Sequence, residues 1–443
     1  MKTAGVCTRR AFLKATAGAV GAPLVIPASA IGGDGRPSPA ERITMGFIGV
    51  GGQGGGHLYG GAWTYLPGGY VARDDVQVLA VCDVRRDRRE LGVNRVNEHY
   101  SRKNPSGAYV SARGYVDFRE VLARPDIDAV LIATPIYWHG IMTIMAARAG
   151  KDIYCEKPTA CFIGESKAAR DAVKRYARVF QGGTQQRSEY GGKFRWACEL
   201  VRSGRIGTLR SVYACINGGG VQFERWFGPG KPVPDGLDWD LYLGPAPWSP
   251  YNGQAHAHMF GTGGINWGQH HYDVVQWAIA GADETGPVEI WFEQGRPMYR
   301  YANGVVVYGC HYPDPSIGLG GKVRFAGEGG CVYVGTDGII AVDRQQIIAN
   351  PPDILKKPLG PDDARVYFSQ SHSGNFLECV RTRKRTICDI ESSHRAASLM
   401  LLGWIAECLR RRLKWDPVAE RFENDDQANR MLSTTFRPPW NVV

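Results

Sequence analysis

The chain has 443 residues, of which 44% are hydrophobic and 22% charged, as is typical of a folded protein with about two domains. These values exclude a disordered, collagen-like or coiled-coil protein, and no apolar run of about 18 residues lies inside the body of the chain to span a membrane. The net charge of +10 raises nucleic acid or a membrane surface as a partner, but no motif supports nucleic-acid binding and we predict none.

Residues 1–30 are predicted to be a targeting signal that is not part of the fold. Thr8–Lys14 reads TRRAFLK, a twin-arginine pattern, an apolar stretch over 15–26 follows, and Ala28-Ser29-Ala30 resembles a cleavage site. An ordinary first helix with a basic start is the alternative. Because the twin-arginine (Tat) translocation machinery exports folded proteins, the signal predicts a periplasmic or extracytoplasmic location, with a membrane anchor if the signal is retained.

The cysteines and histidines give no metal-site or disulfide pattern. None of the eleven cysteines forms a Cys-x-x-Cys pair and several lie in apolar runs, which favours buried free thiols. His256-x-His258 and His270-His271 have no carboxylate or cysteine at ligand spacing beside them. We therefore predict no bound metal.

Residues 31–41 are predicted to be a linker, and after it strand and helix patterns alternate. The expected strands are 43–48, 76–82, 128–134, 152–155 and 179–184, and the expected helices are 139–149 and 165–178. This alternation predicts an α/β domain over residues 42–184, built on a doubly wound parallel sheet of the Rossmann type.

The pattern changes after residue 184. The expected strands are then 288–292, 304–310, 322–325 and 331–334, and the expected helices are 194–204, 375–383 and 392–412. Residues 185–443 are therefore predicted to form an α+β domain with a large, mostly antiparallel open sheet. Arg410–Arg412 are expected in the last turn of the closing helix, and the C-terminal helices are expected to pack back on the Rossmann domain.

A glycine-rich turn follows the first expected strand. Gly49-x-Gly51-x-x-Gly54 stands between that strand and a plausible helix start, where glycines let the backbone approach a pyrophosphate. Asp83 closes the second strand, where an acid would hydrogen-bond the adenosine ribose and favour NAD over NADP. Arg85 and Arg86 follow and would offset that preference, unless they are a solvated charge run.

Several different short motifs follow one another along the chain. They are Gly49–Gly54, Ala133-Thr134-Pro135 with His139, Ala149-Gly150-Lys151, Glu156-Lys157-Pro158, and Gly263-Gly264-x-Asn266-x-Gly268-x-His270-x-x-Asp273. Together they resemble the glucose–fructose oxidoreductase and inositol dehydrogenase family (Gfo/Idh/MocA). The twin-arginine start, Gly183–Ser188 and Leu237–Pro245 are similar to the exported bacterial branch of that family. The resemblance covers residues 42–440.

The resemblance implies hydride transfer between a sugar-like carbinol carbon and a nicotinamide. Lys157 would orient the hydroxyl and stabilise negative charge on its oxygen, and His270 would be the base. Asn266 stands where the family commonly places Asp, and an amide can bind a sugar hydroxyl but cannot accept a proton. His270 would then act alone or with Lys157. Asp273 is expected to be structural.

The resemblance also implies the remaining site residues. The expected cofactor ligands are Gly49, Gly51, Gln53, Gly54, Asp83, Arg85, Thr134, Pro135, His139, Glu156 and Lys157. The expected substrate contacts are Gln185, Arg187, Trp267 and His271. The open sheet is expected to carry the substrate and an oligomer contact, giving a homodimer or homotetramer.

The predicted function is that of an NAD(P)-dependent oxidoreductase acting on a CH–OH group of a sugar, polyol or glycoside. One alternative is an NAD-dependent glycosidase or epimerase-type enzyme that keeps NAD bound and recycles it. Export favours that alternative, or an oxidoreductase coupling two sugars, because free NAD is scarce outside the cytoplasm. A second alternative is a non-catalytic sugar- or NAD-binding protein.

Overall fold

The structure is a computed structural model. It describes residues 41–61, 64–103, 112–216, 229–253, 268–279, 281, 285–310, 318–319, 325 and 329–441. The predicted signal, most of the predicted linker and most of the expected strand 322–325 lie outside these residues. Among the residues described, no helix has the length and apolar character needed to cross a bilayer. The cysteines described are free thiols, and all but Cys408 are buried, as expected.

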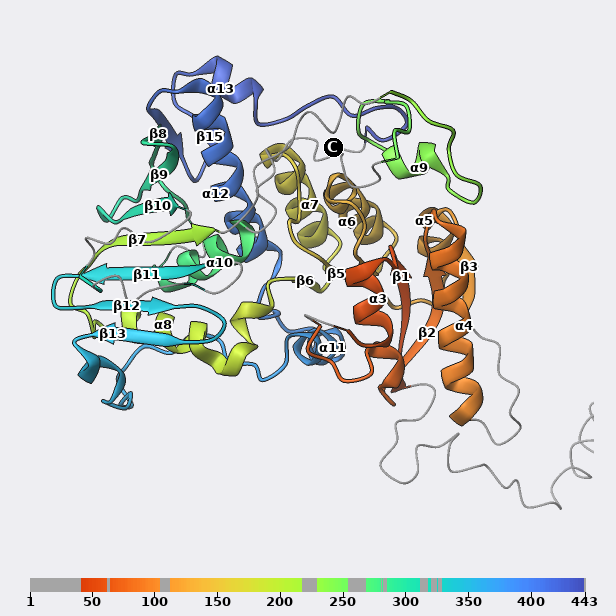
Figure 1. Ribbon diagram of the computed structural model, residues 1–443, viewed down its shortest axis with the longest axis horizontal. Helices are drawn as coiled ribbons and strands as arrows, with labels where there is room; N and C mark the ends of the chain where they lie inside the picture. The colour runs from red at the N-terminus through yellow and green to blue at the C-terminus, as the bar shows by residue number, and fades with distance from the viewer. Residues whose placement is uncertain are drawn as a thin grey trace, which may run out of the picture. The chain divides into compact units, whose positions relative to one another are not determined.

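Six parallel strands form the first sheet, in the order β3-β2-β1-β4-β5-β6 (Figure 1). Their bounds are β1 Ile43–Ile48, β2 Val76–Cys82, β3 Arg113–Tyr115, β4 Ala129–Ile132, β5 Asp152–Cys155 and β6 Phe180–Gly182. The chain order reverses between β1 and β4, and ligands bind such doubly wound sheets at the carboxyl ends of these strands. The predicted Rossmann architecture is confirmed.

Helices cover both faces of this sheet. They are α3 Gly52–Tyr59, α4 Arg86–Lys103, α5 Phe118–Leu122, α6 His139–Arg148 and α7 Ile163–Arg175, with short turns η2 Tyr70–Ala72 and η3 Ile136–Trp138. Apolar residues of α5, α6 and α7 share one core with Phe436 and Trp440. On the other face α3 and α4 share a core with α11 (His372–Thr382), which comes from the C-terminal part of the chain.

Nine strands form the second sheet, in the order β13-β12-β11-β7-β10-β9-β8-β14-β15. Their bounds are β7 Leu209–Ile216, β8 Glu289–Glu293, β9 Arg296–Arg300, β10 Val306–Cys310, β11 Gly329–Gly335, β12 Ile339–Val342, β13 Ile347–Asn350, β14 Leu413–Asp416 and β15 Arg421–Phe422. The β7–β10 pair is parallel, and the other neighbouring pairs in this sheet are antiparallel. The predicted mostly antiparallel sheet is confirmed.

Helices α8, α10 and α12 pack on one face of the second sheet and bury its largest apolar core. The remaining elements of this part are η4 Gln185–Arg187, η5 Tyr190–Gly192, α8 Lys193–Arg202, α9 Trp239–Leu243, α10 Gly268–Ala278, η8 Pro352–Leu355, α12 Ile390–Leu409 and α13 Asp426–Arg430.

The end of α12 differs from the sequence prediction. The helix stops at Leu409, and Arg410 takes a left-handed conformation with φ +52°. The chain turns there because residues 413–416 join the edge of the sheet beside β8. Arg411 and Arg412 pair with Asp425 and Glu289 and do not extend the last helical turn, so that prediction was wrong.

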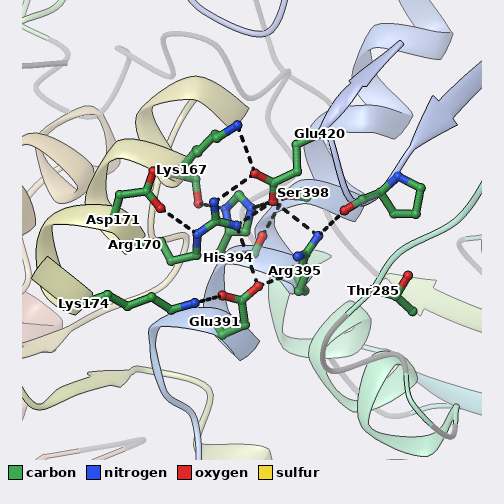
Figure 2. Close-up of polar contacts among 12 residues, drawn as sticks. Lys167, Arg170, Asp171, Lys174, Thr285, Glu391, His394, Arg395, Ser398 and Glu420 are labelled. Carbon is green, nitrogen blue, oxygen red and sulfur yellow. Dashed lines mark hydrogen bonds and ion pairs between the residues drawn. The ribbon is translucent and has the colours of Figure 1, made fainter. Parts of the chain in front are cut away.

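A buried ion network ties α7 to α12, as Figure 2 shows. The carboxylate of Glu420 accepts hydrogen bonds from Arg170 (2.6 and 3.0 Å) and is bonded to Nε2 of His394 at 2.6 Å. Arg395 lies 3.3 Å from Glu420 and also donates to Glu391 at 2.8 Å. Burial opposes ionisation, yet the bonds from His394 and Arg170 hold the pKa of Glu420 far below its ordinary value of 4.5.

We expect Glu420→Gln to lower the free energy of unfolding by about 2 kcal/mol at pH 7, because it leaves two guanidinium groups without their shared carboxylate. Since the folded-state pKa of Glu420 is depressed, this stabilisation is present above pH 4.5 and is lost as the pH falls further. Urea unfolding at pH 7 and at pH 4 would measure both effects. Glu423→Gln, at an exposed position nearby, is the matched control. Equal stability of the two variants would contradict the prediction.

Candidate functional site

The glycine turn between β1 and α3 leaves the backbone open to a ligand. Gly54 must be glycine, since a Cβ there would lie 1.8 Å from the carbonyl oxygen of Gly49. Helix α3 begins at Gly52, and no side chain in the described part of the chain caps it at Gly51. Its first N–H groups therefore remain available for an anion.

A cavity of about 470 Å³ opens at the carboxyl ends of the parallel strands. The predicted site residues that line it are Gly49, Gly51, Gln53, Asp83, Arg85, Thr134, Pro135, His139, Glu156, Lys157, Gln185 and His270. Gly54, Arg187 and His271 are not among its lining residues. Asn266 and Trp267 lie outside the described residues. The cavity thus joins the glycine turn to side chains from the C-terminal half of the chain.

Asp83 sits at the end of β2, at one end of the cavity. Its carboxylate accepts the backbone N–H groups of Val50 and Arg85, both at 2.9 Å, and burial raises the pKa of the carboxyl. The Arg85 guanidinium is engaged by Asp87 at 2.7 Å. An acid that faces the cavity, beside an arginine whose charge is already paired, suits a ribose hydroxyl.

The Glu156 carboxylate gathers groups from three elements. Its Oε1 is bonded to His57 Nε2 at 2.7 Å and accepts from Gln185 Nε2 at 2.9 Å and Gln53 Nε2 at 3.2 Å. Its Oε2 accepts the N–H of Lys157 at 3.2 Å. Burial alone would raise the pKa of Glu156, but His57 and the charge of Lys157 hold it below the ordinary value. Gln53 and His57 stand four residues apart on α3, so their side chains share one face of the helix. This spacing is the sequence signal from which His57 could have been predicted.

The other end of the cavity combines two cations with a histidine. Lys157 follows β5, and His270 lies in the first turn of α10. Arg344, after β12, lies over the Tyr190 ring at 4.9 Å and donates to Gln186 at 3.5 Å. Burial, with the charges of Lys157 and Arg344, lowers the pKa of His270 well below 6.5, so its imidazole is neutral at pH 7. Arg344 and Tyr190 also line the cavity, although neither was predicted from the sequence.

His139 joins the turn after β4 to the segment that carries Lys157. Its Nε2 lies 2.8 Å from the carbonyl oxygen of Thr134 and its Nδ1 lies 2.6 Å from that of Pro158, and a neutral ring donates its single N–H to one of the two. Burial lowers the pKa of this imidazole. The ring therefore fixes the distance between two walls of the cavity.

The structure places Arg187 away from the expected substrate contact. Its guanidinium donates to both carboxylate oxygens of Asp273 (2.7 and 2.8 Å) and lies 4.9 Å from the Trp277 ring centre. Both charged groups are buried and bind η4 to α10, which corrects the expectation for Arg187. Asp273 is structural, as predicted. His271 is buried in α10 and does not line the cavity.

These features fit a dinucleotide. The uncapped start of α3 and the close-packed glycines suit a pyrophosphate, Asp83 suits a ribose, and Lys157 with His270 lies where a reactive ring would end. Within the described ranges no cluster of three or more His, Cys, Asp or Glu has metal-binding geometry.

Comparison with known proteins assigns a family to both parts. Residues 43–184 match the Gfo/Idh/MocA model described as oxidoreductase family, NAD-binding Rossmann fold, and residues 200–442 match the one described as oxidoreductase family, C-terminal alpha/beta domain. An alpha-N-acetylgalactosaminidase of Shewanella oneidensis is 30% identical over 216 residues, which is 45% of this chain and 44% of that protein. The match thus spans less than half of that relative.

Solved structures show the same fold. The WlbA dehydrogenase from Bordetella pertussis, in complex with NADH and UDP-GlcNAcA, has a TM-score of 0.56 at 15% identity and covers 85% of this chain and 99% of its own. The aldose-aldose oxidoreductase from Caulobacter crescentus, complexed with glycerol, has a TM-score of 0.54 at 16% identity, with coverage of 84% and 99%.

We expect Gly54→Ala to weaken NAD binding at least about tenfold, because the added methyl would displace the Gly49 carbonyl and open the turn. Titration of the purified protein with NAD would measure the change in Kd. Gly360→Ala is the control: this glycine does not line the cavity, and a Cβ there would meet Asp363 only at an ordinary contact distance of 3.8 Å, so affinity should stay unchanged. The same Kd for Gly54→Ala and the unaltered protein would refute the role given to this turn.

Proposed function

We propose that this chain, which belongs to the Gfo/Idh/MocA oxidoreductase family and has its NAD-binding Rossmann domain, oxidises or reduces a CH–OH group of a sugar, polyol or glycoside. One observation carries the proposal. Lys157 and His270, from the two halves of the chain, line the same cavity as the Gly49–Gly52 turn and Asp83. A cation and a neutral imidazole at one end of a dinucleotide cavity are the groups that carbinol oxidation needs.

In this proposal each group of site residues has a separate role. The Gly49–Gly52 turn and Asp83 would hold the pyrophosphate and ribose, and bound NAD would supply a hydride acceptor or donor. Lys157 would donate a hydrogen bond to the substrate oxygen and stabilise its negative charge. His270 would take the hydroxyl proton on an imidazole nitrogen, since its lowered pKa keeps it neutral. The Glu156 carboxylate would hold Lys157 in place by accepting a hydrogen bond from the backbone N–H of Lys157.

A second candidate is a glycosidase that keeps NAD bound and regenerates it within each turnover. Its support is the set of relatives named glycosyl hydrolase family 109 proteins, of which one Shewanella sequence is 30% identical over 208 residues. The predicted export by the twin-arginine route also favours a retained cofactor. We further propose NAD in preference to NADP, on the basis of Asp83 and the paired Arg85, and a homo-oligomer that acts outside the cytoplasm.

Two measurements separate these candidates. Purified protein is denatured and the supernatant assayed for NAD, and the native protein is then incubated with sugars, polyols and aryl glycosides. Accumulation of NADH in solution supports the dehydrogenase, whereas glycoside cleavage without net NADH supports the glycosidase. Binding of NAD with neither reaction on the whole panel would favour the non-catalytic alternative.

We expect Lys157→Ala to lower kcat/KM by about 10²–10³-fold, as is usual when a donor to a developing oxyanion is removed. Bound NAD should remain, because the glycine turn and Asp83 are unchanged. Turnover and released NAD are measured on the same preparation, with Lys356→Ala, whose side chain is 75% exposed, as control. Undiminished turnover by Lys157→Ala would sink this assignment.

The pH profile tests His270. Its pKa lies well below 6.5, so the neutral base persists as the pH falls through that value and is lost only in more acidic solution. The logarithm of kcat/KM should therefore stay level between pH 8 and 6.5 and fall only at lower pH. His270→Gln should remove both the activity and this acidic limb. A limb centred at or above pH 6.5 would show that another group is the base.

A further inference from the structure

We infer that Leu237–Ala246, here called the clasp, is part of the NAD site and closes its adenosine end, so that release of NAD requires the clasp to move. The clasp belongs to the C-terminal half of the chain and contains α9. Within it lies the motif Leu237-Asp238-Trp239-Asp240 followed by Gly244-Pro245, to which the proposed chemistry gives no role.

The start of the clasp pairs with the backbone that directly follows β2. An antiparallel bridge joins Leu237 to Arg85, and the N–H of Asp238 donates to the carbonyl of Val84 at 3.1 Å. These partners come one and two residues after Asp83, the predicted ribose ligand. The clasp is therefore fixed by main-chain bonds at the ribose end of the cavity.

The middle of the clasp rests on the turn η3. The indole Nε1 of Trp138 donates to the carbonyl of Leu241 at 3.1 Å, and the hydroxyl of Tyr137 donates to the carbonyl of Tyr242 at 2.9 Å. Gly244 has φ +51°, and a Cβ there would lie 2.0 Å from the Trp138 ring. Only glycine allows the clasp to lie this close to the indole.

The C-terminal segment holds the far side of the clasp. Arg437 donates to the carbonyls of Gly244 (2.7 Å) and Asp240 (2.8 Å) and to the Asp240 carboxylate at 2.5 Å. Trp440 packs edge-on against Trp138 with ring centres 4.6 Å apart. Arg437 thus anchors the clasp without lining the cavity.

The motif residues order the clasp itself. The Asp238 carboxylate accepts the N–H of Leu241 at 2.9 Å and caps the start of α9. Trp239 stacks on the Tyr242 ring, with centres 5.1 Å apart, and donates from its indole to the Ser249 carbonyl at 2.9 Å. These contacts hold Tyr242 in one orientation.

Tyr242 and Leu241 form a wall of the cavity, together with Asp83, Arg85 and Arg88 from the Rossmann domain. Tyr242 is only 8% exposed, and burial raises the pKa of its hydroxyl to about 12, so it presents a neutral aromatic surface. The flat apolar faces of an adenosine match such a wall. The main-chain and arginine contacts of the clasp must loosen before a ligand behind it can leave.

The test follows NAD release and needs no substrate. Full-length protein is loaded with NADH, an excess of NAD is added, and the decay of energy transfer from tryptophan to bound NADH gives the release rate. Tyr242→Ala removes the wall, and Arg437→Gln removes the anchor but leaves the cavity lining intact. We expect each to speed release roughly tenfold, as is common when a buried aromatic or arginine contact is lost.

Two variants serve as controls. Trp248→Ala, at a 64% exposed aromatic in the same segment, should release NADH at the wild-type rate. Arg430→Gln, at an exposed arginine of α13 that does not line the cavity, is the matched control for Arg437→Gln and should do so too. Wild-type rates in both Tyr242→Ala and Arg437→Gln would overturn the inference. The inference rests on the NAD binding of the proposed function and not on its substrate. If the protein were inactive on every sugar but released NADH at the predicted rates, only the proposed chemistry would be contradicted.

Discussion

The buried carboxylate of Glu156 is the interaction on which the site depends. A buried charge is costly unless opposite charges and hydrogen-bond donors surround it, and here Gln53, His57, Gln185 and the N–H of Lys157 do so. Two of these come from the helix that follows the glycine turn, and one comes from the segment that leads into the second part. The hydrogen bonds to this one carboxylate therefore fix the position of Lys157 relative to the glycine turn between β1 and α3.

The rest of the cavity depends on contacts between the two parts of the chain. The Glu420 network joins α7 to α12, and α11 completes the core on the α3 and α4 face of the first sheet. Because α12 also packs against α10, which carries His270, the Glu420 network is linked through these two helices to the end of the cavity where His270 lies. Arg437 and the clasp lie beside the opposite end, where the chain leaves β2. The cavity is thus lined by the Rossmann domain and, at both ends, by residues from later in the sequence.

The sequence predicted those features that local patterns determine. The bounds of β1, β2 and β5 agree with the structure, since each is a short apolar run beside a turn signal. Helix α4 was missed because only Gly92, Val96 and Tyr100 are buried on its 18 residues, so no apolar stripe marks it. Arg344 and Tyr242 carry no local sequence signal, since only tertiary contacts bring them to the cavity. Arg187 was expected at the substrate because its buried partner, Asp273, is 86 residues away in the sequence.

The electrostatics where Lys157 and His270 line the cavity set a condition on the proposed chemistry. Burial and the charges of Lys157 and Arg344 make His270 a weak base, and a weak base removes a proton only from a hydroxyl that is itself acidified. In the proposed mechanism Lys157 would meet this condition, because the same positive charge that lowers the proton affinity of the imidazole would stabilise an alkoxide. The proposed roles of the two side chains therefore depend on each other: the cation that weakens His270 as a base would also make the substrate hydroxyl a stronger acid.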